Sequence, residues 1–190
     1  MAMEQTIRVL NRMVEDHVIG RYAIGGAVAA FNYVESSFTE DLDILISFEN
    51  SAKPSALIVL TPIYDCLAKQ GYTKHNKEGI LVEGWPVQFL PVANALDEEA
   101  LAEALDVNLK VGDSEESVTC RVLSPEHIVA TALSVGRPKD WIRINQFIDQ
   151  NAFDATRLCA ILARHRLQEK WTGFCDRFEV ADPCRSERKP

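Results

Sequence analysis

The feature that most constrains the fold is a short aliphatic run, Ile44-Leu45-Ile46, which follows directly on Asp41-Leu42-Asp43. A continuous apolar segment of this length is typical of a central strand that is buried on both faces. Side chains two positions apart on a strand project from the same face, so both carboxylates are expected to point the same way. The run therefore predicts a sheet with this strand at its centre and a pair of acids at the start of the strand.

Helical and strand-like patterns alternate along the first two thirds of the chain, and the last third is helical. Predicted strands cover residues 22–24, 41–48, 72–75, 79–83, 87–92, 107–111 and 118–123. Predicted helices cover residues 4–18, 27–33, 54–69, a segment starting at 97, a segment from 125 to a break at Gly136, 139–150 and 154–172. We expect an α/β (α+β) core over residues 1–123, a C-terminal helical subdomain over 124–180 and a flexible tail over 181–190.

Composition narrows the class of protein. The 190 residues are 47% hydrophobic and 25% charged, as in globular proteins, and the net charge of −8 disfavours broad binding to a polyanion, so no DNA partner is expected. No apolar run approaches the ~18–20 residues of a membrane helix, and the N-terminus lacks a secretory signal. The five cysteines show no metal or disulfide spacing, so we expect reduced thiols in a cytoplasmic protein without a membrane partner.

The acidic pair Asp41 and Asp43 has two interpretations. Neighbouring carboxylates raise each other's pKa unless a cation lies between them, and a hard divalent ion with oxygen ligands, Mg²⁺ or Mn²⁺, suits that position. The alternative is a solvated strand end, where aspartate is common.

Gly25-Gly26 lies directly after a predicted strand and before a predicted helix. Two glycines allow backbone to approach a ligand closely and leave N–H groups available to an anion. The alternative is an ordinary tight turn. The fingerprints G-x-G-x-x-G and G-x-x-x-x-G-K-[ST] are both absent.

Taken together, Ile24-Gly25-Gly26, a gap of fourteen residues and Asp41-Leu42-Asp43-Ile44 resemble the signature of the nucleotidyltransferase superfamily. Within this superfamily, the chain resembles the minimal and abortive-infection-type (AbiEii-like) bacterial nucleotidyltransferases. Phe38 and Thr39 match the approach to their acidic pair. A second block resembles the family at Ser124-Pro125-Glu126-His127-Ile128 and at Gly136-Arg137-Pro138-Lys139-Asp140.

The resemblance implies a nucleotidyltransferase-like fold, a small mixed sheet with flanking helices. It further implies that Gly25, Gly26 and Thr39 contact a nucleoside triphosphate and that Asp41 and Asp43 are the catalytic residues and hold Mg²⁺. The reaction moves a nucleoside monophosphate to an acceptor hydroxyl on an RNA end, a protein or a small molecule. A cognate toxin or antitoxin is the implied protein partner.

Two further cations in the second block, Arg137 and Lys139, are candidate nucleotide-binding residues because either could reach phosphates. The alternative is a helix-joining turn with a surface ion pair.

The chain departs from the family at three positions. Gln88 occupies the place of the usual third carboxylate, Ala132 that of a lysine and Arg143 that of an aspartate. An amide oxygen can contact a cation but brings no charge and cannot act as a base. A catalytically silent nucleotide- or partner-binding relative is therefore the alternative. A sugar-nucleotide glycosyltransferase, in which D-x-D also binds a metal, is a weaker one.

Overall fold

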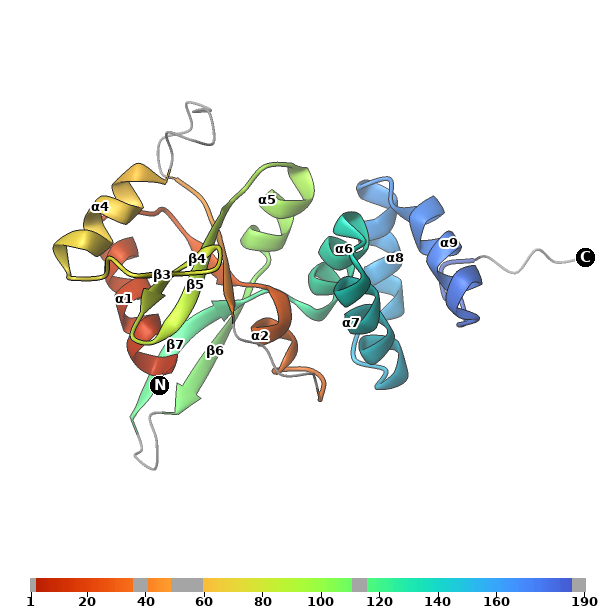
Figure 1. Ribbon diagram of the computed structural model, residues 1–190. Coiled ribbons are helices and arrows are strands. Elements are labelled where there is room, and N and C mark those ends of the chain that lie inside the picture. The colour runs from red at the N-terminus through yellow and green to blue at the C-terminus, as the bar shows by residue number, and fades with distance from the viewer. Residues whose placement is uncertain (1–2, 36–40, 49–59, 111–115, 186–190) are drawn as a thin grey trace, which may run out of the picture. The chain divides into compact units, whose positions relative to one another are not determined.

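The computed structural model describes residues 3–35, 41–48, 60–110 and 116–185. The chain divides into two compact units (Figure 1). The first, here called the α/β unit, consists of Met1–Ala29 and Ser37–Leu123. The second, the helical unit, consists of Ala30–Ser36 and Ser124–Pro190. Among the helices that the structure describes, none is both long and apolar enough to cross a membrane.

The described part of the α/β unit contains a seven-stranded mixed sheet of order β3-β4-β5-β2-β1-β7-β6. Its strands are β1 (Tyr22–Ile24), β2 (Leu42–Ile46), β3 (His75–Asn76), β4 (Gly79–Val82), β5 (Trp85–Pro91), β6 (Leu105–Lys110) and β7 (Ser117–Val122). The middle strand β2 runs antiparallel to β1 and parallel to β5, and β1 runs parallel to β7. The predicted small mixed sheet, with the Ile44-Leu45-Ile46 strand at its centre, is confirmed.

Both faces of β2 are buried beyond its acidic start. Leu42, Ile44 and Ile46 alternate onto one face and are fully buried, while Leu45 on the other face is 7% exposed. Asp43, on the face of Leu45, is only half-buried. Because a buried strand excludes water, a half-exposed acid at its beginning lies where the covering layer ends.

The structure describes four helices in this part of the chain: α1 (Met3–Glu15), α2 (Gly26–Ala30), α4 (Thr61–Lys69) and α5 (Ala95–Ala102). Helix α1 buries Ile7, Leu10 and Met13, which recur at three-residue steps, and it packs against β7. Pro62 lies in the first turn of α4, a position that tolerates proline. The earlier part of the predicted helix 54–69 falls outside the described residues.

The helical unit contains α6 (Pro125–Val135), α7 (Pro138–Asp149), α8 (Ala155–Arg164) and α9 (Gln168–Phe178). Helix α6 contacts the other three helices and is buried around most of its circumference. As predicted, Ser124 caps it and Gly136 ends it, with φ +72°. These helices confirm the C-terminal helical part of the predicted fold class.

Two expectations for the C-terminal region are wrong. The predicted helix 154–172 is two helices, because the chain turns at Arg166, which has φ +57°. In addition, Cys159 and Cys184 form a disulfide, which joins α8 to the segment after α9, although reduced thiols were expected. Their 25-residue separation carries no recognisable spacing, so the pairing arises from tertiary packing.

Candidate active site

The two sequence motifs meet where β1 ends beside β2. Ile24 is paired with Ile44, and the backbone N–H of Gly25 donates to the carbonyl oxygen of Asp43 over 2.8 Å. On the other side of β2, Asp43 is paired with Gln88 of β5. Because directly paired residues project to the same face of a sheet, the side chains of Asp43 and Gln88 are neighbours. The end of β1 with the glycine turn, the start of β2 with Asp43, and β5 with Gln88 thus lie next to one another across the sheet.

The most restrictive contact among these residues joins Gly26 to the carboxylate of Asp43. Gly26 has φ +61°, in the left-handed region that favours glycine, and begins α2. A Cβ atom added to Gly26 would lie 2.1 Å from Oδ2 of Asp43 and 3.0 Å from its Cγ. Glycine is therefore required here for two independent reasons, and its missing side chain makes room for the acid.

The backbone amides of the glycine turn have different roles. The Gly25 N–H is already bonded to Asp43, so it is not one of the available donors expected from the sequence. The Gly25 carbonyl accepts from Ala29, which makes Gly26 the first residue of α2. The first N–H groups of a helix have no acceptor within the helix. Since α2 has only five residues, we assign the anion-binding potential to these local N–H groups and not to a helix dipole.

Asp41 immediately precedes β2 and is half-buried. That its carboxylate shares the face of Asp43, as the two-residue spacing predicts, stays a prediction. Among the acids that the structure describes, Asp41, Asp43 and Glu78 do not form a three-carboxylate site, because their carboxylate oxygens are not all within 4.8 Å of one another. Thr39, the other predicted nucleotide contact in this region, lies outside the described residues.

Gln88 is oriented by a carboxylate that the sequence analysis missed. Its Nε2 donates to Oε2 of Glu78 over 3.1 Å, and Glu78 is an exposed residue in the turn between β3 and β4. An amide that donates through its nitrogen presents its oxygen elsewhere as an acceptor. Glu83, at the opposite end of the β4–β5 hairpin, accepts instead from the hydroxyl of Tyr72. Burial, followed by this hydrogen bond, raises the pKa of Tyr72 to about 12.

The residues present fit a hard divalent cation. Asp43 offers carboxylate oxygens and Gln88 a neutral amide oxygen of the same hard type from one face of the sheet, and Asp41 directly precedes the strand of Asp43. The bare Cα of Gly26 accommodates the Asp43 carboxylate beside the first amides of α2. The arrangement therefore places ligands for a cation next to donors for an anion.

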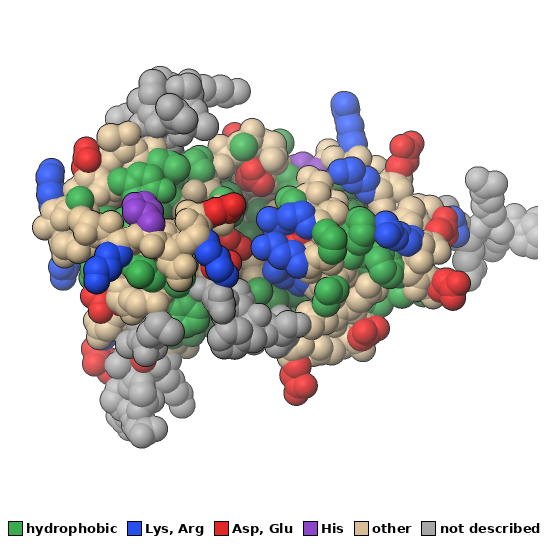
Figure 2. All heavy atoms as spheres, in the orientation of Figure 1, with side chains coloured by type: hydrophobic (Ala, Val, Ile, Leu, Met, Phe, Trp, Pro, Cys, Tyr) green, Lys and Arg blue, Asp and Glu red, His purple; other side chains and the backbone are tan. Residues whose placement is uncertain are grey.

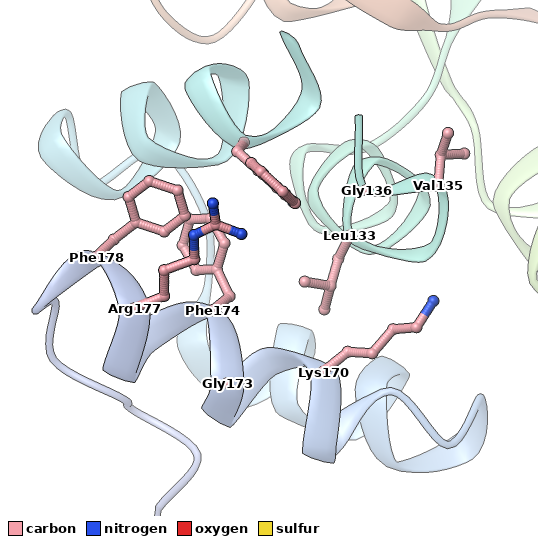
Figure 3. Close-up of a pocket in the computed structure, with 9 residues that line it drawn as sticks. Leu133, Val135, Gly136, Lys170, Gly173, Phe174, Arg177 and Phe178 are labelled. Carbon is pink, nitrogen blue, oxygen red and sulfur yellow. The ribbon is translucent and has the colours of Figure 1, made fainter. Parts of the chain in front are cut away.

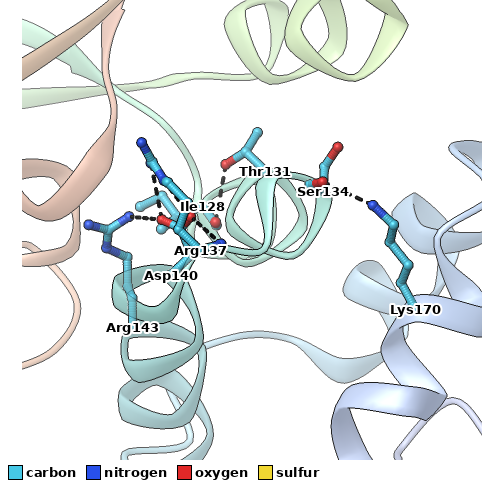
Figure 4. A network of polar contacts seen from close by, with 7 residues as sticks. All are labelled: Ile128, Thr131, Ser134, Arg137, Asp140, Arg143 and Lys170. Carbon is cyan, nitrogen blue, oxygen red and sulfur yellow. Dashed lines mark hydrogen bonds and ion pairs between the residues drawn. The ribbon is translucent and has the colours of Figure 1, made fainter.

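Arg137 and Lys139, the cations of the second sequence block, belong to the helical unit, where Arg137 and Arg143 pair with a buried acid (Figure 4). Asp140 is 1% exposed and receives Nε of Arg137 at 2.8 Å and Nη1 of Arg143 at 3.5 Å. The backbone N–H of Arg137 also donates to Asp140, which closes the N-terminal cap of α7. Arg137 is thus engaged in a structural pair, whereas Lys139 is exposed. Nucleotide binding by either residue stays a prediction.

Ala132 and Arg143, the other two positions singled out in the sequence, have local explanations in the helical unit. Ala132 is 4% exposed in the centre of α6, where a lysine would bury its charge. Arg143 has a 13% exposed side chain and pairs with Asp140. Both residues therefore have roles in packing or charge pairing in this chain.

No protein-family model matches the chain, and no curated protein matches it either. Among solved structures, one similar to this chain is the crystal structure of ANT(2")-Ia in complex with adenylyl-2"-tobramycin. The alignment covers 90% of this chain and 98% of that chain, with 15% sequence identity and a TM-score of 0.40. The function proposed next therefore rests on the geometry of the site itself.

Proposed function

We propose that this protein is a divalent-metal-dependent nucleotidyltransferase, which moves a nucleoside monophosphate from a nucleoside triphosphate to an acceptor hydroxyl and releases pyrophosphate. One observation carries the proposal. The carboxylate of Asp43 lies against the bare Cα of Gly26, so that cation ligands and the first amides of α2 lie side by side. A metal-bound triphosphate is a ligand that presents both charges together.

Each residue has a distinct part in this proposal. Asp41 and Asp43 would hold Mg²⁺ or Mn²⁺, which when bound neutralises charge on the phosphates. The amides that open α2 would donate to phosphate oxygens, and Gly26 keeps the Asp43 carboxylate beside them. Gln88 can accept a hydrogen bond or contact the ion, but it cannot take a proton at neutral pH. An aspartate of the pair is therefore the group that would accept the proton of the incoming hydroxyl.

Binding of nucleotide tests the proposal directly. Titration calorimetry with each nucleoside triphosphate and Mg²⁺ should show binding that EDTA abolishes. Asp43→Asn should weaken that binding at least about tenfold, because it removes a charge from the ion's ligands. Asp106→Asn, on the exposed edge strand β6, is the matched control and should leave binding unchanged. Absence of Mg²⁺-dependent binding in the wild type would contradict the proposal.

A catalytically silent, nucleotide- or partner-binding role is the second candidate, and the Gln88–Glu78 hydrogen bond favours it. In this candidate, the amide of Gln88 takes the place of a charged third metal ligand, and the carboxylate of Glu78 is hydrogen-bonded to that amide. Incubation with labelled triphosphates and candidate acceptor RNA, protein or small molecules separates the two functions. If the wild type is silent, Gln88→Asp should create transfer activity. A fully active wild type would exclude this silent role. A toxin or antitoxin partner is proposed only as part of this second candidate function.

A further inference from the structure

The helical unit contains a hollow that the proposed chemistry does not use. It has a volume of about 350 Å³ and lies between the C-terminal end of α6, the start of α7 and one face of α9. Its apolar lining comes from Leu133 and Val135 of α6, Trp141 of α7, and Phe174 and Phe178 of α9. Figure 3 shows Leu133 pointing from α6 toward α9, between two cationic side chains of α9.

The two cations mark the ends of the hollow. Lys170 and Arg177 are seven residues apart on α9, which corresponds to a separation of about 10 Å along the helix axis. The guanidinium carbon of Arg177 lies 4.1 Å from the centre of the Trp141 ring, and within the described chain no carboxylate pairs with it. Lys170 donates to the Ser134 carbonyl oxygen over 3.0 Å, which uses one of its three N–H groups. Both cations therefore keep donors for a ligand.

The middle of the hollow is open because of Gly173. A Cβ added there would meet nothing within 4 Å, and this glycine has no positive φ. Neither crowding nor backbone conformation requires glycine inside α9, where it costs helix stability. Val135, at the rim, is 59% exposed. An apolar side chain could thus lie over Gly173 with a cation on either side.

We propose that this hollow binds an acidic segment of a partner protein, with two carboxylates about 10 Å apart and a large apolar side chain between them. Charge complementarity favours this occupant. The whole chain has a net charge of −8, but residues 157–190 carry eight basic and five acidic side chains. Figure 2 shows hydrophobic side chains exposed between Lys and Arg side chains on the helical unit. An aromatic or aliphatic anchor between charged groups is the usual make-up of an interaction hot spot.

A designed peptide tests the proposal. The probe is a fluorescein-labelled helical peptide with two glutamates seven positions apart and a Phe-Leu pair midway, and the control peptide carries glutamine at both acidic positions. Anisotropy should show binding of the acidic peptide that weakens with salt, and at least about tenfold weaker binding of the control. In NMR spectra, the indole N–H signal of Trp141 should shift. That of Trp171, which is buried and bonded to Asp182, should not.

Substitutions test whether the acidic peptide binds in this hollow. Gly173→Leu should fill the hollow, and Arg177→Gln should remove one charge, and each should weaken binding about tenfold or more. Gly173→Ala is the matched control and should change affinity by less than about twofold, since it adds one methyl to open space. Circular dichroism checks that every variant is folded. Equal binding by Gly173→Leu, a shift of Trp171 instead of Trp141, or failure of the acidic peptide to bind would overturn the proposal. Occupation of the hollow by single-stranded RNA or by a second copy would also do so.

Discussion

Asp43 in the α/β unit and Asp140 in the helical unit are both aspartates beside a helix N-terminus, but their surroundings are opposite. Asp140 is 1% exposed, caps α7 and lies between two arginines. Asp43 is half-exposed, follows another acid by two positions and lies against the Cα of Gly26. The first arrangement satisfies a charge within the protein. The second keeps a carboxylate half-exposed beside a glycine, where the proposed function places a metal-bound triphosphate.

The largest expected effect concerns Asp140. Asp140→Ala should lower the free energy of unfolding by about 3–5 kcal/mol, because it removes the buried carboxylate that pairs with Arg137 and Arg143 and opens the cap of α7. Urea denaturation followed by circular dichroism measures the change. Asp106→Ala, which removes an exposed partner of Arg121, should cost less than about 1 kcal/mol. A small loss for Asp140→Ala would show that the comparison with Asp43 is unfounded.

The disulfide is a further difference between the two units, since both of its cysteines belong to the helical unit. Reduction of Cys159–Cys184 should destabilise that unit by about 2–3 kcal/mol, because the unfolded chain regains the freedom of the closed loop. Thermal denaturation with and without a reductant should show the shift, and Cys184→Ser should abolish the response to the reductant. An equal response to the reductant in Cys184→Ser would contradict this assignment. Cys120 of the α/β unit should stay unreactive whether the disulfide is intact or reduced, since burial raises the pKa of its thiol to about 11.

Much of the fold could be predicted because its signals are local. The aliphatic run after Asp43 marks the central strand, and Ser124, Pro125 and Gly136 mark the ends of α6. The break between α8 and α9 could not be predicted in this way. Arg166 adopts φ +57° without glycine or proline nearby, because tertiary packing decides the turn. The disulfide is equally non-local.

The same distinction between local and non-local signals applies to the candidate site. The spacing of Asp41 and Asp43 is read from strand alternation, whereas the place of Gln88 is implied only by the family resemblance, and in the structure Gln88 is paired with Asp43. The contact of Gly26 with Asp43 and the bond from Gln88 to Glu78 depend on how β1, β2 and the β3–β4 turn come together. No sequence signal distinguishes Glu78 from other turn acids, so only the three-dimensional structure reveals it.

A smaller effect tests the contact that carries the proposed function. Gly26→Ala should cost about 2 kcal/mol, part from the positive φ and part from overlap with the Asp43 carboxylate. Gly71→Ala is the matched control, since Gly71 has φ +92° but nothing within 4 Å of an added Cβ, so it reports the backbone part alone. Combining Gly26→Ala with Asp43→Ala should recover about 1 kcal/mol, which a double-mutant cycle by urea denaturation measures. Strict additivity would show that the two residues do not touch.

The smallest effect on stability is expected at the residue most important for the proposed function. Asp43→Asn keeps the shape that lies against Gly26 and removes the repulsion from Asp41, so the free energy of unfolding should change by less than about 0.5 kcal/mol. The same substitution at Asp140 leaves two arginines facing a neutral amide and should cost several times more. Paired urea titrations of both variants measure the difference. If Asp43→Asn is as destabilising as Asp140→Asn, then the charge of Asp43 serves to stabilise the fold, which would contradict its proposed role in ligand binding.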